Sequence, residues 1–211
     1  MKYYFTFLFF VTSLSIQAQK RLFNLSIEYA PNFSRLTHEI VDEHFKLSHQ
    51  TLLRIHYNTT GIIQPSMGIG FLNTGSFARQ EVTNNQLGLR RVTFFQNYNY
   101  VFIPIGAKIS IGSYYALPEI GLAFNVSNKT RQITEFTDGQ VVKETRDMQL
   151  NFGTHNPLTI PLNIAIGRNI NVGKFSFSTG IKGYYSLNQV VKDVVRDNQY
   201  FGFGIFIGME L

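Results

Sequence analysis

The clearest structural signal in the chain is the segment YFGFGIFIGMEL at residues 200–211. Every odd position from Phe201 to Leu211 carries a large apolar side chain, whereas the even positions carry mainly glycine. Successive side chains of a β-strand point to opposite faces, so a period of two gives a strand one wholly apolar face. The segment therefore predicts a β-strand with one apolar face and one face of mostly small side chains.

The same alternation recurs upstream. Seven further segments show it, at residues 23–29, 53–57, 64–71, 101–111, 119–126, 158–167 and 175–182. The connections between the eight segments alternate in length. Short turns are expected at residues 58–61, 112–114 and 169–173, and long polar loops at residues 34–50, 75–91, 129–146 and 188–198. Even-stranded outer-membrane barrels have this rhythm, with short periplasmic turns and long external loops.

The second face of these segments distinguishes a membrane barrel from a soluble sandwich. A soluble sandwich would carry many Lys and Glu residues on its polar face, but here that face carries mostly Gly, Ser, Asn and Ala. A small membrane barrel turns its apolar face to lipid and its small or polar face inward. The sequence thus predicts an all-β fold, an eight-stranded antiparallel up-and-down transmembrane β-barrel, with inner glycines leaving room for larger groups.

Tyrosines near the predicted strand ends suggest an aromatic girdle, in which the ring lies at the membrane interface and the hydroxyl stays wet. Ordinary β-propensity would also enrich tyrosine. The residues concerned are Tyr29, Tyr57, Tyr98, Tyr100, Tyr114, Tyr115, Tyr184, Tyr185 and Tyr200.

Composition narrows the possible functions. The 211 residues include no cysteine, 15% charged and 15% aromatic residues, and a net charge of +6. The absence of cysteine excludes a disulfide scaffold, a cysteine nucleophile, a thiolate metal site and a lipoprotein anchor. The basic residues form no stripe interleaved with aromatic residues, so no nucleic-acid partner is expected. An excess of cations suits the anionic headgroups of membrane lipids.

The first nineteen residues, MKYYFTFLFFVTSLSIQAQ, have the layout of a secretory signal peptide. Lys2 supplies the positive charge, an apolar stretch follows, and Ala18 lies at the short polar end. The unbroken apolar run of residues 5–11 is too short for a membrane-spanning helix, which needs about 20 residues. We therefore expect a cleaved signal at 1–19, a barrel domain at 20–211, and Sec-type export to the outer membrane of a Gram-negative bacterium.

Three features together resemble the PorT-like outer-membrane β-barrel domains of Bacteroidetes-type bacteria. They are IEYAPNFS at residues 27–34, VFIPI at residues 101–105, and the glycine-rich final strand, all behind a signal peptide. The resemblance covers essentially the mature chain and implies an eight-stranded outer-membrane barrel, without one shared activity. Such barrels commonly end in an aromatic residue, whereas this chain ends in Glu210-Leu211. The insertion signal is therefore expected to be weaker than usual.

A search for catalytic or cofactor chemistry yields little. Potential metal ligands gather between His38 and His44, but their spacing fits no zinc template. Neither a nucleophile elbow, a P-loop nor a dinucleotide fingerprint occurs. The nearest candidate for a lipid A-modifying enzyme is the Ser48-His49 dipeptide, which alone is weak evidence because catalytic triads are defined by geometry. We expect no catalytic, metal or cofactor site, and hence no enzyme.

Projecting the eight segments inward places six charged residues in the lumen, as three acids and three bases. They are Glu28, Arg54, Lys108, Glu119, Lys182 and Glu210. Pairing would offset the cost of burying them. Lys108 and Glu119 flank the turn near Ser113 almost symmetrically, so they are expected to form a cross-strand pair within a closed lumen.

The function expected from these observations is a non-enzymatic outer-membrane barrel, monomeric, with a side-chain-filled lumen and outer-membrane lipid around it. Its long external loops would contact a protein or glycan partner. A lipid A-modifying enzyme, a narrow pore and a secretion-accessory barrel remain alternatives. Both chain ends are expected to face the periplasm, with the loops around Asp42, Asp138 and Asp193 outside.

Overall fold

The computed structural model describes residues 22–37, 43–59, 61–81, 88–148, 156–173, 175–190 and 198–211. The signal peptide predicted at residues 1–19 lies outside the described residues, as do His38, Asp42, His155 and Asp193. No helix within the described ranges is long and apolar enough to cross a membrane.

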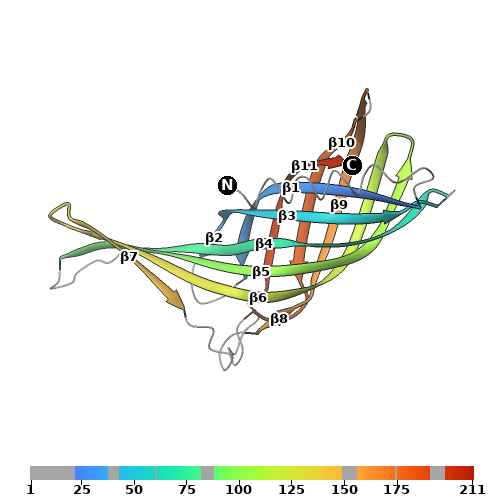
Figure 1. The fold of residues 1–211 in the computed structure, drawn as a ribbon. Coiled ribbons are helices and arrows are strands. Elements are labelled where there is room, and N and C mark those ends of the chain that lie inside the picture. Colours follow the sequence, from blue (N-terminus) through green and yellow to red (C-terminus); the bar gives the residue numbers. More distant parts are fainter. Residues whose placement is uncertain are drawn as a thin grey trace, which may run out of the picture.

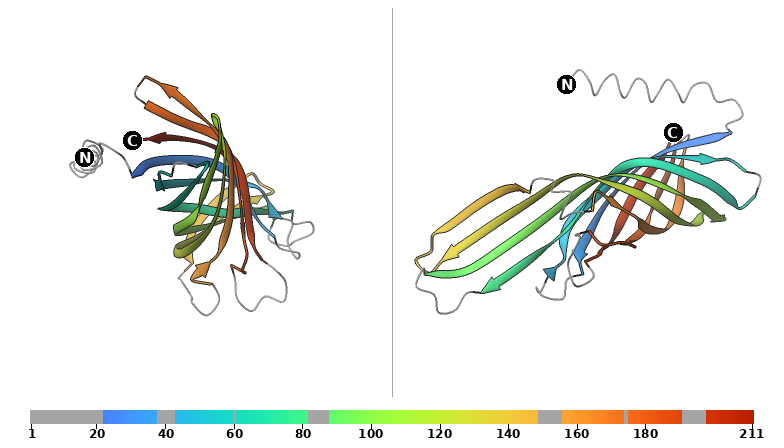
Figure 2. Two further views of the ribbon diagram at one scale, coloured as in Figure 1. Left: turned by 90° about the vertical axis from the view of Figure 1, so that its right-hand side faces the viewer. Right: turned by 90° about the horizontal axis from the view of Figure 1, so that it is seen from below.

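Eight long antiparallel strands close into a ring (Figures 1 and 2). Each pairs with its neighbours in sequence, and the first pairs with the last. The ring strands are β1 (Phe23–Leu36), β3 (Lys46–Tyr57), β4 (Ile63–Glu81), β5 (Leu89–Ile111), β6 (Tyr114–Phe136), β9 (Pro161–Val172), β10 (Phe175–Ser186) and β11 (Tyr200–Glu210). The shorter β2 (Glu43–His44), β7 (Val141–Met148) and β8 (Leu158–Thr159) add to its edges. The predicted eight-stranded up-and-down barrel is confirmed.

The beginning of β1, the end of β11 and the short turns lie at one end of the ring, which we call the turn end. Phe23 pairs with Tyr57 beside the β3–β4 turn, and the Leu211 amide donates to the Leu25 carbonyl at 2.8 Å. Gly112 and Gly173 occupy the two other turns with φ of 61° and 60°, a left-handed conformation that favours glycine. The opposite end is called the loop end.

The barrel is apolar outside and polar inside. Outward side chains of β11 are strongly exposed, with Phe203 at 53% and Ile205 at 64%. Buried positions of the same ring carry Glu28, Arg54 and Lys182 together with many Ser and Asn side chains. A water-soluble protein has the opposite distribution, because apolar exposure to water is unfavourable.

Large side chains fill the lumen. Towards the loop end, Leu52, Leu72, Tyr100, Phe102 and Tyr200 belong to one buried cluster. Glycines make space for them, as expected from the sequence: a Cβ added at Gly121 would lie 2.1 Å from the Phe102 ring, and one at Gly202 would lie 2.4 Å from the Tyr184 ring. The interior is therefore packed with ring systems as well as polar groups.

The predicted tyrosine girdle is only partly present. Four of the nine tyrosines are exposed on the outer face: Tyr29, Tyr57, Tyr114 and Tyr185. The other five are buried in the lumen: Tyr98, Tyr100, Tyr115, Tyr184 and Tyr200. The expectation was wrong for these five because they share the inward parity of their strands, for example Tyr184 with Lys182.

Two of the predicted long loops are largely strand. Residues 73–81, 91–99, 127–136 and 141–148 form a four-stranded sheet of β4, β5, β6 and β7 beyond the ring, which we call the β-arm. It projects to the left in Figure 1 and in the right-hand view of Figure 2. Asp138 lies in the β6–β7 turn at its tip. The loop prediction failed there because both faces of these strands mix apolar and polar side chains, so no regular alternation marks them.

Candidate functional site: the charged lumen

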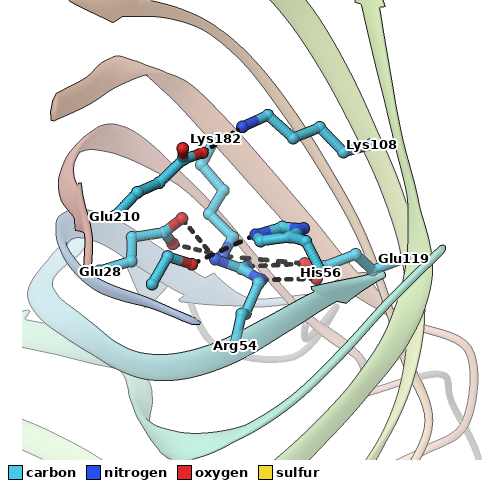
Figure 3. Close-up of polar contacts among 8 residues, drawn as sticks. Glu28, Arg54, His56, Lys108, Glu119, Lys182 and Glu210 are labelled. Carbon is cyan, nitrogen blue, oxygen red and sulfur yellow. Dashed lines mark hydrogen bonds and ion pairs between the residues drawn. The ribbon is translucent and has the colours of Figure 1, made fainter. Parts of the chain in front are cut away.

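Six charged side chains enter the lumen from six different strands. They lie at inward positions of β1, β3, β5, β6, β10 and β11, and five of the six are classed as buried. The residues are Glu28, Arg54, Lys108, Glu119, Lys182 and Glu210, and Figure 3 shows them converging. These are the six residues singled out from the sequence. The structure divides them into a cluster of four and a separate pair.

The cluster of four is centred on Arg54, whose side chain is 2% exposed. Its Nη1 donates to Glu28 Oε2 at 2.6 Å. Its Nε and Nη2 donate to the two carboxylate oxygens of Glu119 at 2.8 and 2.9 Å. Such a two-pronged contact uses the planar geometry of both groups and is among the stronger charged hydrogen bonds.

Lys182 completes this cluster from β10. Its Nζ donates to Glu28 Oε1 at 2.8 Å and lies 4.0 Å from Glu119 Oε2. Two acids and two bases are thereby brought together, and their formal charges cancel. Since β3 and β6 are separated by two strands of the ring, the contact between Arg54 and Glu119 runs across the lumen.

The predicted pair between Lys108 and Glu119 is wrong. Lys108 Nζ donates to Glu210 Oε1 at 2.6 Å and lies 4.6 Å from the centroid of the Tyr115 ring. Glu119 pairs in register with Gly106, so Lys108 is displaced from it along the strand. In a narrow barrel, acidic side chains on other walls are as close to Lys108 as those on the neighbouring strand. Strand register alone therefore did not identify its partner.

His56 lies on the inner face beside the charges, and its Nε2 is 3.2 Å from Ser26 Oγ. The sequence did not predict a second polar layer, which lies closer to the loop end than His56. There Tyr184 Oη donates to Asn32 Oδ1 at 3.0 Å, and Tyr200 Oη lies 3.0 Å from Thr159 Oγ1. The inward parity of both tyrosines was the signal available for this second layer.

Ser48 and His49 do not come together. Ser48 is buried in the lumen with its Oγ 2.6 Å from Ser34 Oγ. The His49 ring lies on the other face of β3, between the rings of Tyr29 and Phe71 at 6.3 and 6.1 Å. Adjacent residues of a strand point to opposite faces, so this dipeptide makes no Ser-His pair. Within the described ranges, no group of three or more His, Asp or Glu side chains is placed to hold a metal ion.

A closed antiparallel ring with an apolar exterior and an ion-paired interior defines the class of transmembrane β-barrels. The sequence matches no protein-family model and no curated protein. The PorT-like resemblance therefore stays a prediction.

Solved structures with a similar arrangement include small outer-membrane proteins. Ail, the attachment invasion locus protein of Yersinia pestis, solved with the heparin analogue sucrose octasulfate, is 12% identical, with 90% of this chain and 97% of that chain covered and a TM-score of 0.42. Neisserial surface protein A is 7% identical, with 90% and 98% covered and a TM-score of 0.42. A major outer membrane protein from Thermus thermophilus is 8% identical, with 90% and 100% covered and a TM-score of 0.47.

Proposed function

We propose that this chain is a non-enzymatic outer-membrane β-barrel protein of a Gram-negative bacterium, exported by the Sec route and monomeric. In this proposal its lumen is closed and its β-arm projects from the cell surface as an interaction surface. The observation that carries the proposal is the inverted barrel, apolar outside and ion-paired inside. An exterior of this kind is stable in hydrocarbon and unfavourable in water.

The packing of the lumen favours a closed barrel over a narrow pore. The hollow bordered by Glu28, Arg54, Lys108 and Glu210 has a volume of about 10 Å³. A cavity needs roughly 10–15 Å³ of volume to hold one water molecule. The hollow is therefore too small for a continuous column of water. The buried cluster that contains Tyr100, Phe102 and Tyr200 fills the lumen between this hollow and the loop end.

The β-arm supports the interaction role. Arg131 and Lys143 are exposed on it together with the acids Asp138 and Glu144, and Arg91 pairs with Glu81 and Glu135 at 3.3 Å near its end. A projecting sheet that exposes charges of both signs fits a protein or glycan partner with complementary charges. A secretion-accessory role, by analogy with PorT-like barrels, is a second form of the same proposal in which the partner is a protein of the envelope.

The closed lumen is tested by single-channel recording in planar bilayers. We expect no steady current from the wild-type barrel at any applied potential. The double variant Arg54→Ala/Lys182→Ala, which removes both bases of the cluster, provides a comparison in which conductance can appear. Steady conductance of the wild type would favour the pore instead.

The enzyme alternative is tested by incubating the reconstituted barrel with lipid A and weighing the products by mass spectrometry. We expect an unchanged lipid mass. A changed mass that disappears in Ser48→Ala, with the fold retained, would contradict the non-enzymatic role.

A further inference from the structure

Arg168 is an anomaly of the outer surface. Among the described residues of the eight ring strands, it is the only charged side chain at an outward position in the half of the barrel nearer the turn end. Its neighbours on the outward face of β9 are Ile166 and Ile170, exposed by 53% and 43%. A cation on the lipid-facing surface is unfavourable unless it reaches the interface or finds an anion.

Arg168 lies beside an interfacial tyrosine. It pairs in register with Tyr114, and its guanidinium carbon is 5.6 Å from the centroid of the Tyr114 ring. Tyr114 directly follows the β5–β6 turn and is exposed. Tyrosine is enriched where a barrel surface meets the headgroup region. The guanidinium is therefore positioned at the level of lipid phosphates on the turn side.

The outer surface is hollowed beyond Ile166, on the side away from Arg168. Two adjoining hollows of about 600 and 810 Å³ share Ile164 of β9 and Gly183 of β10. The first extends across β11 and β1 to Leu47 of β3, and the second extends from β11 across β6 to Ile105 of β5. Ile166, Ile181 and Phe203 are among the residues that line the first hollow, and Leu162, Tyr185 and Phe201 are among those that line the second. Gly183 forms the floor because it is the outward position of β10 that lacks a side chain between Ile181 and Tyr185.

Arg168 is not among the residues that line the hollows, but it is the next outward residue of β9 after Ile166, which lines the first hollow. Ile166 pairs with Ile181, Ile164 pairs with Gly183, and Arg168 pairs with Thr179. Arg168 is therefore two residues beyond Ile166 and four residues, or about 13 Å, from the level of Gly183. An apolar groove with one cation at its interfacial end matches a molecule with an acyl chain and a phosphate.

We propose that this groove binds one glycerophospholipid, with its phosphate on Arg168 and Tyr114 and an acyl chain along Ile166, Ile181 and Gly183. The inference rests on the membrane location proposed above. With the turn end facing the periplasm, the site faces the phospholipid leaflet of the outer membrane. Charge complementarity and the apolar lining select this occupant over a neutral lipid or a second barrel.

The test is native mass spectrometry of the detergent-purified barrel, titrated with phosphatidylglycerol or with diacylglycerol bearing the same acyl chains. We expect one phosphatidylglycerol per barrel, bound more tightly than diacylglycerol. Arg168→Gln lowers phosphatidylglycerol affinity about tenfold, as loss of a charged hydrogen bond would, and leaves diacylglycerol unchanged. Gly183→Leu lowers binding of both lipids, because the new side chain fills the groove.

Matched controls separate the site from a general effect on the surface. Arg35→Gln removes an outward cation of β1 at the loop end, and Thr51→Leu adds apolar bulk to the outward face of β3. Neither should alter lipid binding. A Cβ added at Gly183 meets no atom closer than 3.7 Å, so Gly183→Leu should fold, and unboiled gel mobility checks that it does. Arg168→Gln provides a second test that does not depend on this variant.

Three results would overturn the proposal. Phosphatidylglycerol binding unchanged in both Arg168→Gln and Gly183→Leu would show that lipid binds elsewhere. Equal affinities of the wild type for the two lipids would show that the phosphate does not contribute to binding. A barrel dimer lost in Gly183→Leu would assign the groove to a second copy. Membrane fractionation tests the location independently, so failure of the lipid site is distinguishable from failure of the proposed function.

Discussion

Arg54 donates three hydrogen bonds to buried carboxylates, more than Lys108 or Lys182. It contacts Glu28 at 2.6 Å and Glu119 at 2.8 Å, and both carboxylates are nearly inaccessible to solvent. Without Arg54, Lys182 alone would have to balance two buried carboxylates. A buried ion pair adds little net stability compared with an apolar pair, but breaking one from a single side is costly.

We therefore expect Arg54→Met to lower the free energy of unfolding by about 3–5 kcal/mol, the usual cost of leaving a buried charge uncompensated. Lys108→Met should cost less, because the side chain of its partner Glu210 is 21% exposed and can be hydrated. Thermal unfolding of the detergent-solubilised barrel, followed by far-UV circular dichroism, measures both. Equal losses in the two variants would contradict the difference in burial.

The partner of Lys108 can be established by double-mutant cycles. Lys108→Met and Glu210→Gln should show a coupling of about 0.5–3 kcal/mol, the range for residues in direct contact. Lys108→Met and Glu119→Gln should be additive within about 0.5 kcal/mol, because Glu119 is bound to Arg54. Coupling between Lys108 and Glu119, with additivity between Lys108 and Glu210, would support the pair that the sequence predicts across the β5–β6 turn.

The six lumen residues could be found from the sequence because strand parity gives the face of each side chain. Their pairing could not, because parity says nothing about distance across the lumen. Arg54 reaches Glu119 on the far wall, and Lys108 reaches Glu210 on β11, 102 residues along the chain. Such contacts depend on how the ring closes, which no local pattern encodes.

At the scale of a strand, glycines on the two faces have different roles. Gly121 faces the lumen against the Phe102 ring, whereas Gly183 faces outward, where an added Cβ would meet only the Gly202 carbonyl oxygen at 3.7 Å. We expect Gly121→Ala to cost about 1–3 kcal/mol, the usual range for overpacking, because the Phe102 ring must move. Gly183→Ala should leave the unfolding temperature nearly unchanged. Similar losses in both would mean that strand propensity, rather than the ring contact, governs the effect.

The β-arm is expected to be separable from the barrel. The ion-paired cluster lies below it, and beyond Asn73 the β4 strand is paired with β5 and, at Phe77 and Ala78, with β2. Replacing residues 76–96 and 130–146 with two-residue turns should leave an insertion-competent barrel that still changes gel mobility on boiling. Loss of that mobility shift would show that the arm belongs to the folding unit.

The strands themselves show where sequence reasoning succeeds. In β11 the apolar alternation extends over the whole strand, and the predicted face is the exposed one. In β4 the alternation ends near Phe71, although the strand continues to Glu81. Beyond that point both faces carry polar side chains, so a strand and a loop have the same composition. The periodic signal reports an asymmetric environment rather than the strand conformation.

At the scale of the molecule, the two ends of the barrel differ in form. The turn end is compact, with the beginning of β1, the end of β11 and the short turns, whereas the loop end carries the β-arm (Figures 1 and 2). An even number of strands places the beginning of β1 and the end of β11 at the same end of the ring. Outer-membrane barrels have their short turns in the periplasm and their long connections outside, so the β-arm should face the surroundings of the cell.

This orientation can be tested with epitopes inserted at two turns of the full chain. Asp138 lies at the tip of the β-arm and Gly112 lies in the β5–β6 turn at the opposite end. Antibody added to intact cells should label the Asp138 insertion and leave the Gly112 insertion unlabelled, because the outer membrane excludes antibody. After permeabilisation both should be labelled, which controls for expression and folding. Labelling of Gly112 but not Asp138 in intact cells would show that the barrel has the opposite orientation. The groove near Arg168 would then face the outer leaflet instead of the phospholipid leaflet.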